Sequence, residues 1–556
     1  MKKNKRFLAV SLALIMVMGI LAACAPAATP DAGVPGAAPA APAVAAPPAE
    51  LPPEGGEAMG GFVGEVEEGA NLARHIDIVL SEELVVVNPT LPAGNGAAPT
   101  WSHRLLHDRL LDQPEPGVFV GALATEWETD DFQTWRFHLR NDVTWHNGDH
   151  FTAECVRFTV ENALANPGTL AWNRWRDVAE AVVVDTYTVD LILVAPNVDI
   201  FFELANHGGA SILNQRAFNE NPDDPMWASV GTGPFRVVNF VSSSFMTLER
   251  FDDYWGEMPP TESLTLWSVP EQATRAVMLQ NGEVQLAFGL AAEDLNRFEA
   301  EPDFQLFSSI NVSPTSLSFN NMGNELMMDR YFRLALAHGI NTADVAYAHA
   351  GRWAMAPWDG NVWGAGVQYR LEGLPKREHN PDLAREYLSR SVYNGEAVLL
   401  AMIPPTIAGE VIQMQLAAIG VNIEIDTMDL PSLVGGHTYD PNSDHNVRQL
   451  HLFGIAANPS ALRTLRTGFY PGSATNRLNY SNPVVTELIR TMAGTDDEQI
   501  RRNAVYQIQE ILYEEIPAIP VFFTVTGVVA IDGIGGVVMG NDPFATCMRN
   551  VFLDMG

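Results

Sequence analysis

Alternation of apolar and polar residues at 135–140 predicts a half-buried β-strand. These six residues read Trp-Arg-Phe-His-Leu-Arg, and a period of two is the side-chain period of a strand. After a second extended stretch, the Asn-Gly-Asp sequence at 147–149 indicates a tight turn, because glycine adopts positive φ without steric cost. Thr152 then suits the N-cap of a helix that continues through Leu164. The segment therefore predicts strand, strand, turn and helix.

The same two periodicities continue along the chain in an order that mixes strands and helices. Strands are expected at 75–80, at 182–193 as a hairpin that turns at Asp185-Thr186, at 315–320 and at 421–425, and helices at 101–111, 273–279 and 410–419. Gly420 stands between the last of these helices and the strand that follows it. Glycine commonly ends a helix because it accepts the left-handed conformation. This order is typical of an α/β fold.

The first 24 residues have the layout of an export signal. Four basic residues lie within positions 2–6, and an uncharged apolar run extends from Phe7 to Ala23. A run of about 17 residues is marginal for a spanning helix, which needs about 20. The pattern predicts a signal peptide at 1–23 that is removed during export. The alternatives are an uncleaved membrane anchor and a plain signal peptide followed by a chance cysteine at position 24.

A stretch dominated by alanine, proline and glycine follows and extends to roughly residue 61. It has no periodicity and almost no large apolar side chains, so it cannot bury a core. Proline-rich stretches act as semi-rigid spacers, and we assign residues 24–70 to such a linker. The remaining chain of about 490 residues is too long for a single core and is expected to divide into two or three substructures.

Charge and cysteine content limit the classes of partner. The formal net charge is −34, which disfavours binding to nucleic acid or anionic lipid because nothing offsets the repulsion by phosphate. Two of the three cysteines, Cys155 and Cys547, lie beyond the N-terminal region, and no CxxC or zinc-ribbon spacing exists. We expect two isolated thiols, with a disulfide between them as the alternative.

Candidate catalytic patterns are incomplete throughout the chain. His103 and His107 lie four apart on a predicted helix, but no H-E-x-x-H pattern is present. His138, His146 and His150 gather around the predicted turn without a recognised ligand spacing. Neither a G-x-S-x-G elbow nor a P-loop occurs. We therefore expect no enzyme, no cofactor and no resident metal, and an extracellular metallohydrolase that uses the histidine pairs is the alternative.

The segment 135–158 strongly resembles the signature of the family 5 solute-binding proteins of ABC importers, the oligopeptide-, dipeptide- and nickel-binding type. Further family motifs follow in order between Leu72 and Val538, among them the residues 230–237 and 248–256. Cys155 stands where the family usually has aspartate, at a packing or capping position. The residues in register with the signature are Phe137, Leu139, Arg140, Val143, His146, Gly148, Phe151, Thr152, Ala153, Glu154, Val156 and Phe158.

The resemblance implies a fold and a location. The expected fold is a two-lobed α/β receptor of the periplasmic-binding-protein type (class II, cluster C). Lobe I is expected at 71–95, 229–312 and 515–556, with an inserted subdomain at 96–228, and lobe II at 313–514. The Leu-Ala-Ala-Cys sequence that ends at Cys24 resembles a bacterial lipobox, which implies a lipid-modified N-terminus. The receptor would be anchored on the extracytoplasmic face of the cell membrane, in the periplasm if the cell has two membranes.

The resemblance also implies a function. The receptor would capture a peptide or a similar polar solute between its lobes by hinge closure. It would deliver the solute to the permease of an ABC importer, whose ATPase is a separate subunit. We expect a monomer. A ligand sensor of the same fold that serves a signalling system is the alternative, and the sequence does not separate the two.

One family position bears on the ligand. Peptide binders of the family carry an aspartate that pairs with the ligand's α-ammonium, and this chain has Ile455 or Ala456 there. A buried ammonium without a counter-ion costs several kcal/mol, so the usual grip on a peptide N-terminus is absent. A blocked peptide, a sugar, a chelate or another polar solute then becomes the expected ligand, unless Asp426 or Asp429 takes over the pairing.

Eight residues are expected to line the ligand cleft. The loop around Asn88 resembles a family element at the cleft, and tryptophans occupy a glycine-rich, irregular segment at 353–369. Rings on loops often line clefts because they give apolar area at low entropic cost. The predicted set is Asn88, Trp101, Asn320, Trp358, Trp363, Phe453, Ile455 and Asn458.

Overall fold

The computed structural model describes residues 66, 69–84, 87–91, 97–115, 118–206, 208–320, 324–429, 432–433, 449–454, 457–458, 460–473, 476–540 and 547–556. The chain divides into Met1–Gly55 and Gly56–Gly556, and the described residues belong to the second unit. The expected signal peptide, Cys24, most of the linker, Ile455 and Ala456 lie outside the described residues.

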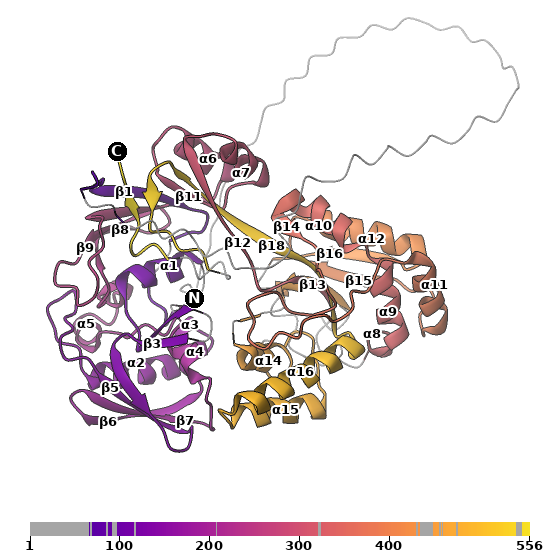
Figure 1. Ribbon diagram of the computed structural model, residues 1–556, viewed down its shortest axis with the longest axis horizontal. Helices are drawn as coiled ribbons and strands as arrows, with labels where there is room; N and C mark the ends of the chain where they lie inside the picture. The colour runs from indigo at the N-terminus through magenta and orange to yellow at the C-terminus, as the bar shows by residue number, and fades with distance from the viewer. Residues whose placement is uncertain are drawn as a thin grey trace, which may run out of the picture. The chain divides into compact units, whose positions relative to one another are not determined.

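Twelve strands of the described chain form one mixed sheet, in the order β16-β15-β17-β13-β18-β11-β1-β10-β9-β8, with β12 and β14 also paired to β18 (Figure 1). Neighbours of β1 and of β15 run parallel to them, and the other pairs are antiparallel. The strands are β1 His75–Leu80, β8 Phe235–Val241, β9 Phe245–Arg250, β10 Ser263–Ser268, β11 Leu286–Phe288, β12 Phe304–Ile310, β13 Thr315–Phe319, β14 Ala354–Met355, β15 Val398–Met402, β16 Ile423–Thr427, β17 Leu450–Gly454 and β18 Ala518–Ile531.

The long strand β18 connects the two halves of this sheet. Its first residues pair with β13, where Ala518 lies opposite Ser318. Its last residues pair with β11 and β12, where Val529 lies opposite Ala287 and Leu306. One element therefore belongs to the hydrogen-bond ladders of both halves.

A separate four-stranded antiparallel sheet has the order β4-β5-β7-β6. Its strands are β4 Ala124–Glu128, β5 Thr134–Leu139, β6 Val178–Asp185 and β7 Thr188–Leu193. Helix α2, Ala153–Ala165, packs against β6 and β7. The apolar residues of β5 point into this core, because alternate side chains of a strand face opposite sides of its sheet. Two short ribbons are β2 Leu111–Glu115 with β3 Val118–Gly121, and β19 Ile534–Gly535 with β20 Phe552–Leu553.

Helices cover the sheets and complete the buried cores. Helices α9, α10 and α12 pack around the half of the large sheet that contains β15 and β16, and α15 packs on α16. None of the helices described here is long and apolar enough to cross a membrane. The helices not yet given are α1 Ala97–Leu106, α3 Leu170–Trp175, α4 Ile200–Leu204, α5 Gln215–Glu220, α6 Gln272–Gln280, α7 Ala292–Glu299, α8 Glu325–Met328, α9 Arg330–Gly339, α10 Thr342–Ala350, α11 Pro381–Arg390, α12 Ile407–Ile419, α14 Ala461–Gly468, α15 Pro483–Ala493 and α16 Glu498–Glu515, with 3-10 turns at Pro225–Ser229 and Gly351–Trp353.

Most of the predicted elements are confirmed. β1, β5, the β6–β7 hairpin, α2, α6 and β13 lie where the periodicity places them. Gly148 has φ +85° in the predicted turn. Gly420 has φ +98° and ends α12 before β16, as expected for a left-handed C-cap.

Two details of the prediction are wrong, and a third is confirmed in position only. The helix expected at 101–111 ends at Leu106, because the Leu106 carbonyl accepts a hydrogen bond from Gly233 at 2.9 Å. The second extended stretch forms only an isolated bridge between Thr144 and His150. Thr152 occupies the N-cap position of α2, as predicted, although its side chain makes no capping hydrogen bond.

Candidate functional site

Two predicted cleft residues near the start of the described chain are held by their neighbours. Asn88 is 3 % exposed, and its Oδ1 accepts hydrogen bonds from the backbone and the hydroxyl of Thr90 at 2.9 and 2.7 Å. Trp101 lies on α1, is 4 % exposed, and its ring centroid is 4.5 Å from that of Phe288. Asn88 therefore fixes a local turn, and Trp101 contributes to a hydrophobic core.

The two predicted tryptophans of the glycine-rich segment differ in exposure. Trp358 is 42 % exposed, with Phe523 and the guanidinium of Arg370 each 5.0 Å from its ring. Arg370 is fixed by Asp359 at 2.6 Å. Trp363 is fully buried and packs in the core formed with α14, α15 and α16. Only Trp358 of this pair presents a free ring surface.

The remaining predicted residues gather around β17 and the start of α14. Asn320, directly after β13, accepts a hydrogen bond from Asn479 at 2.9 Å. Phe453 lies near the end of β17 and is partly exposed. The backbone N–H of Asn458 donates to the hydroxyl of Thr464 at 2.8 Å. Phe453 thus lies near the end of β17, and Asn458 lies shortly before the start of α14.

Helix α14 is the next described element after β17. Ser460 is its N-cap, and the Ser460 hydroxyl accepts from the backbone of Arg463 at 3.1 Å. Ser460 also donates to the carboxylate of Asp199 at 3.2 Å, across 261 residues of sequence. The start of α14 is therefore in contact with the segment that contains α4.

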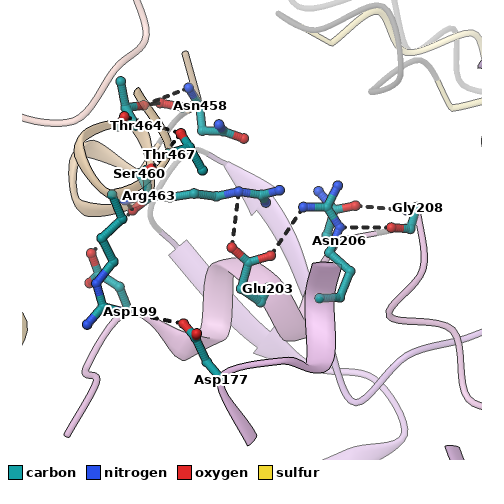
Figure 2. Close-up of polar contacts among 12 residues, drawn as sticks. Asp177, Asp199, Glu203, Asn206, Gly208, Asn458, Ser460, Arg463, Thr464 and Thr467 are labelled. Atoms are coloured by element: carbon teal, nitrogen blue, oxygen red, sulfur yellow. Dashed lines mark hydrogen bonds and ion pairs between the residues drawn. The ribbon is translucent and has the colours of Figure 1, made fainter. Parts of the chain in front are cut away.

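Glu203, on α4, is the centre of a contact between these two segments (Figure 2). One carboxylate oxygen lies 3.0 Å from Nε of Arg463, and the other lies 3.2 Å from Nη1 of Arg174. The exposed fractions of the three side chains are only 12–16 %. Arg174 is positioned in turn by a 2.8 Å hydrogen bond to the carbonyl of Gly208. The Glu203 carboxylate is thus shared by Arg174 of α3 and Arg463 of α14.

Two more ion pairs flank Glu203. Asp199 pairs with Arg501 of α16, and both side chains are at most 10 % exposed. Asp177 lies 3.2 Å from Arg466 of α14, in a more exposed pair. Carboxylates at 177–203 therefore face arginines at 463–501 in all three pairs. We call Asp177, Asp199, Glu203, Arg463, Arg466 and Arg501 the ion-pair contact.

Burial dominates the electrostatics of this contact. It raises the pKa of Glu203 to about 7, against the opposing attraction of Arg174. It also raises the pKa of Asp199 above its usual value, against the attraction of Arg501. Removing water from both carboxylates is costly, so each depends on its arginine partners.

The sequence pattern does not predict the ion-pair contact. Its members are separated by more than 250 residues, as for Arg501 and Asp199 with a separation of 302. A single charged residue on a short helix has no local signature. The one available signal was the apolar face of α14, which indicates a buried helix but not its partner.

Two of the histidines considered as metal ligands bond to backbone carbonyl groups. His103 donates to the carbonyl of Val87, and His146 donates to the carbonyl of Gly233 at 2.9 Å. Burial lowers the pKa of both histidines to about 4. Within the described ranges, no three His, Cys, Asp or Glu side chains are grouped to hold a metal ion. Cys155 is a buried free thiol, and Cys547 is a free thiol of intermediate exposure.

The chain matches known proteins over most of its length. Residues 118–474 match the model of the bacterial extracellular solute-binding proteins, family 5 Middle. The glutathione-binding protein GsiB of Salmonella typhimurium is 27 % identical over 405 residues, which cover 70 % of this chain and 78 % of the relative. GsiB of Escherichia coli K12 is 26 % identical over 404 residues with the same coverage.

Solved structures share the fold. NikA from Brucella suis, in complex with Fe(III)-EDTA, superimposes with a TM-score of 0.75 at 20 % identity and covers 86 % of this chain and 99 % of its own. DppA from Helicobacter pylori, in complex with the peptide STSA, has a TM-score of 0.73 at 19 % identity, over 86 % and 98 % of the two chains.

The mixed sheets and these likenesses define a periplasmic-binding-protein fold of the α/β class. The chain belongs to the bacterial extracellular solute-binding proteins of family 5, because the family's model matches well over half of it. It is therefore an extracytoplasmic binding protein and not an enzyme.

Proposed function

We propose that this protein is the lipid-anchored receptor of an ABC importer, which captures a peptide or another small polar solute between two lobes and delivers it to the permease. Family membership supports the receptor role. The observation that carries the closure mechanism is the ion-pair contact, because it joins residues 177–203 to residues 463–501. In the proposed division these ranges belong to the inserted subdomain (96–228) and to lobe II (313–514).

The proposed division places lobe I at 71–95, 229–312 and 515–556. Two chain connections then link the lobes, namely the residues between β12 and β13 and the end of α16, just before β18. The first connection is held at Ser313, whose hydroxyl donates to the carbonyl of Ala457 at 3.2 Å and accepts from its N–H at 3.0 Å. Two short connections of this kind suit a hinge that opens and closes on a ligand.

Closure is favourable only if the ligand or the protein gains contacts in the closed state. The ion-pair contact supplies such a gain from the protein itself. The proposed ligand residues Asn320, Trp358, Phe453, Ile455 and Asn458 would supply the rest, whereas Asn88, Trp101 and Trp363 are buried in a turn or in hydrophobic cores. Of these, Phe453 and Asn458 adjoin the start of α14, where the ion-pair contact lies.

The ligand class is proposed from relatives and from one substitution. The relatives' names refer to glutathione and to a peptide, and one solved structure holds Fe(III)-EDTA. Ile455 or Ala456 replaces the acid that holds a peptide's α-ammonium in the family, as the resemblance implies. We therefore favour a polar solute that does not rely on a free N-terminus.

Ligand extraction tests the proposal. The full chain is purified in detergent, its bound small molecules are released by denaturation and identified by mass spectrometry, and each is added back in a thermal-shift assay. A ligand that binds only the folded state raises the melting temperature by mass action. Stabilisation by a peptide or another polar solute is expected. Failure of peptides, sugars and metal chelates alike to bind would reject the receptor role.

A further inference from the structure

Strands β13 and β17 present two faces of different character. They pair with Ser316 opposite Phe453 and with Leu317 opposite Leu452. Leu317 and Leu452 belong to a hydrophobic core, so their neighbours Ser316 and Phe453 lie on the other face. The Ser316 hydroxyl is buried on this second face without a hydrogen-bond partner among the described residues. A buried hydroxyl on the second face therefore lacks a hydrogen-bond partner among the described protein atoms.

Arg477 covers Phe453 on this face. Its guanidinium carbon lies 4.5 Å from the centre of the Phe453 ring, within the range of a cation–π contact. The arginine is half-buried. Stacking uses one flat side of the guanidinium and leaves its N–H donors, which lie in the plane of the group, available for other partners.

The segment that carries Arg477 is fixed by side-chain amides. Asn476 donates to the carbonyls of Tyr470 and Tyr480, at 3.2 and 2.8 Å. Asn479 has φ +48° and donates to Asn320 at 2.9 Å. Arg477 is thus held between two anchored asparagines. A residue positioned in this way loses little conformational entropy when a ligand binds.

Arg477 has no counter-ion in the part of the chain that the structure describes: no ion pair or hydrogen bond joins its side chain to a described residue. Burial alone lowers the pKa of its guanidinium, yet arginine stays protonated at physiological pH. By contrast, Arg463, Arg466 and Arg501 each face a carboxylate. An unpaired, half-buried cation is notable in a chain of net charge −34, because acidic partners are abundant.

We propose that Arg477, stacked on Phe453, anchors a carboxylate of the bound solute. This inference rests on the receptor role proposed above and names the chemistry of its ligand. A guanidinium offers two parallel N–H groups that match a carboxylate. The solute would then be held by its acidic end. This agrees with the sequence, because Ile455 or Ala456 stands where the family has the acid that pairs with a ligand's amine. Selection would depend on an anionic group and not on a free N-terminus.

The test compares acids with amides. The full chain and its Arg477→Gln and Arg477→Lys variants are titrated by calorimetry with glutathione and a panel of tripeptides, each as the free acid and with its carboxyl groups amidated. Inorganic phosphate and acetate are each added as competitors. We expect the wild type to prefer the acid by about 10- to 100-fold, the gain of a charge-assisted hydrogen bond. Arg477→Gln removes this preference, and Arg477→Lys restores part of it.

Loss of the preference for acid over amide distinguishes a ligand contact from a structural role. A misfolded variant would bind the acid and the amide more weakly to the same extent. Arg502→Gln is the matched control, since Arg502 also stacks on a ring, that of Tyr369 at 5.2 Å, but pairs with Glu498 on the surface of α16. Equal affinity of the wild type for acid and amide would overturn this inference alone. Displacement by phosphate but not by acetate would overturn the choice of carboxylate. No binding to any probe would overturn the receptor role as well.

Discussion

At the scale of single residues, His146 is held in its neutral form by two backbone groups. The N–H of Gly231 donates to its Nδ1 at 3.1 Å, so the hydrogen lies on Nε2 and is donated to the carbonyl of Gly233 at 2.9 Å. Protonation would place a second hydrogen against the Gly231 N–H. Together with burial, the larger cause, this geometry explains why the pKa of His146 is lowered to about 4.

This pKa predicts a loss of stability in acid. The folded-state pKa lies below the unfolded value of 6.5, so the unfolded state binds more protons between the two. The stabilisation is fully present above pH 6.5 and is lost as the pH falls towards 4. Between pH 7 and pH 5, His146 should account for about 2 kcal/mol of the decrease in unfolding free energy.

Urea unfolding of His146→Gln at both pH values measures this contribution. Glutamine retains a donor for Gly233 but does not titrate, so the decrease should be smaller by about the same 2 kcal/mol. His138→Gln is the control, because His138 lies on the exposed side of β5 near Glu128. An equal decrease in His146→Gln and wild type would show that other groups cause the acid sensitivity.

At the scale of elements, Gly231 sets the end of α1. A Cβ built at Gly231 would lie 1.7 Å from the carbonyl oxygen of Leu106, which is backbone and cannot move aside cheaply. Gly233 donates to the same carbonyl. The loop before β8 therefore packs directly on the last turn of α1 and replaces the next turn of the helix.

Gly231→Ala should lower the unfolding free energy by about 3 kcal/mol or more, through overpacking against backbone. Gly148→Ala gives a matched comparison, because its Cβ would meet nothing within 4 Å and only the positive φ is unfavourable. That variant should lose about 1 kcal/mol. Thermal or urea unfolding distinguishes the two, and similar losses would refute the close contact at Leu106.

Periodicity predicted the elements whose determinants are local. α2 and the α12–Gly420–β16 unit depend on apolar spacing and one glycine, and both lie where the sequence places them. The end of α1 depends on Gly231 and Gly233, more than 120 residues away, so local spacing extended that helix too far. The same limit applies to the site. Phe453 was selected from its motif, whereas Arg477 and Glu203 matter through partners that only the fold brings near.

At the scale of the whole molecule, one proposal concerns its attachment to the cell. Export and lipidation at Cys24 are inferred from the Leu-Ala-Ala-Cys sequence and the basic, apolar N-terminus. Cys24→Ser should release the protein from the membrane fraction without changing ligand affinity, because the linker separates the anchor from the folded chain. Fractionation with metabolic fatty-acid labelling measures this. Retention of label in the variant would place the lipid elsewhere.

The ion-pair contact predicts how closure and affinity are linked. If the contact forms only in the closed state, it adds to the free energy with which a ligand shifts the receptor towards closure. Glu203→Gln and Arg463→Gln should each weaken binding of the extracted ligand by about 1–2 kcal/mol, with little change in the pairing of Asp199 and Arg501.

The double variant Glu203→Gln/Arg463→Gln distinguishes a shared contact from two separate effects. Because both side chains act through one ion pair, the double variant should bind the ligand about as weakly as either single variant, with a coupling energy of about 1 kcal/mol. Glu154→Gln, which breaks an exposed pair with Arg157 on α2, should leave affinity unchanged. Additive losses would mean that the two side chains affect binding separately. Affinity equal to wild type in all variants would mean that the contact also persists in the open receptor and contributes to folding but not to closure. Calorimetric dissociation constants for the four proteins of the cycle decide between these outcomes.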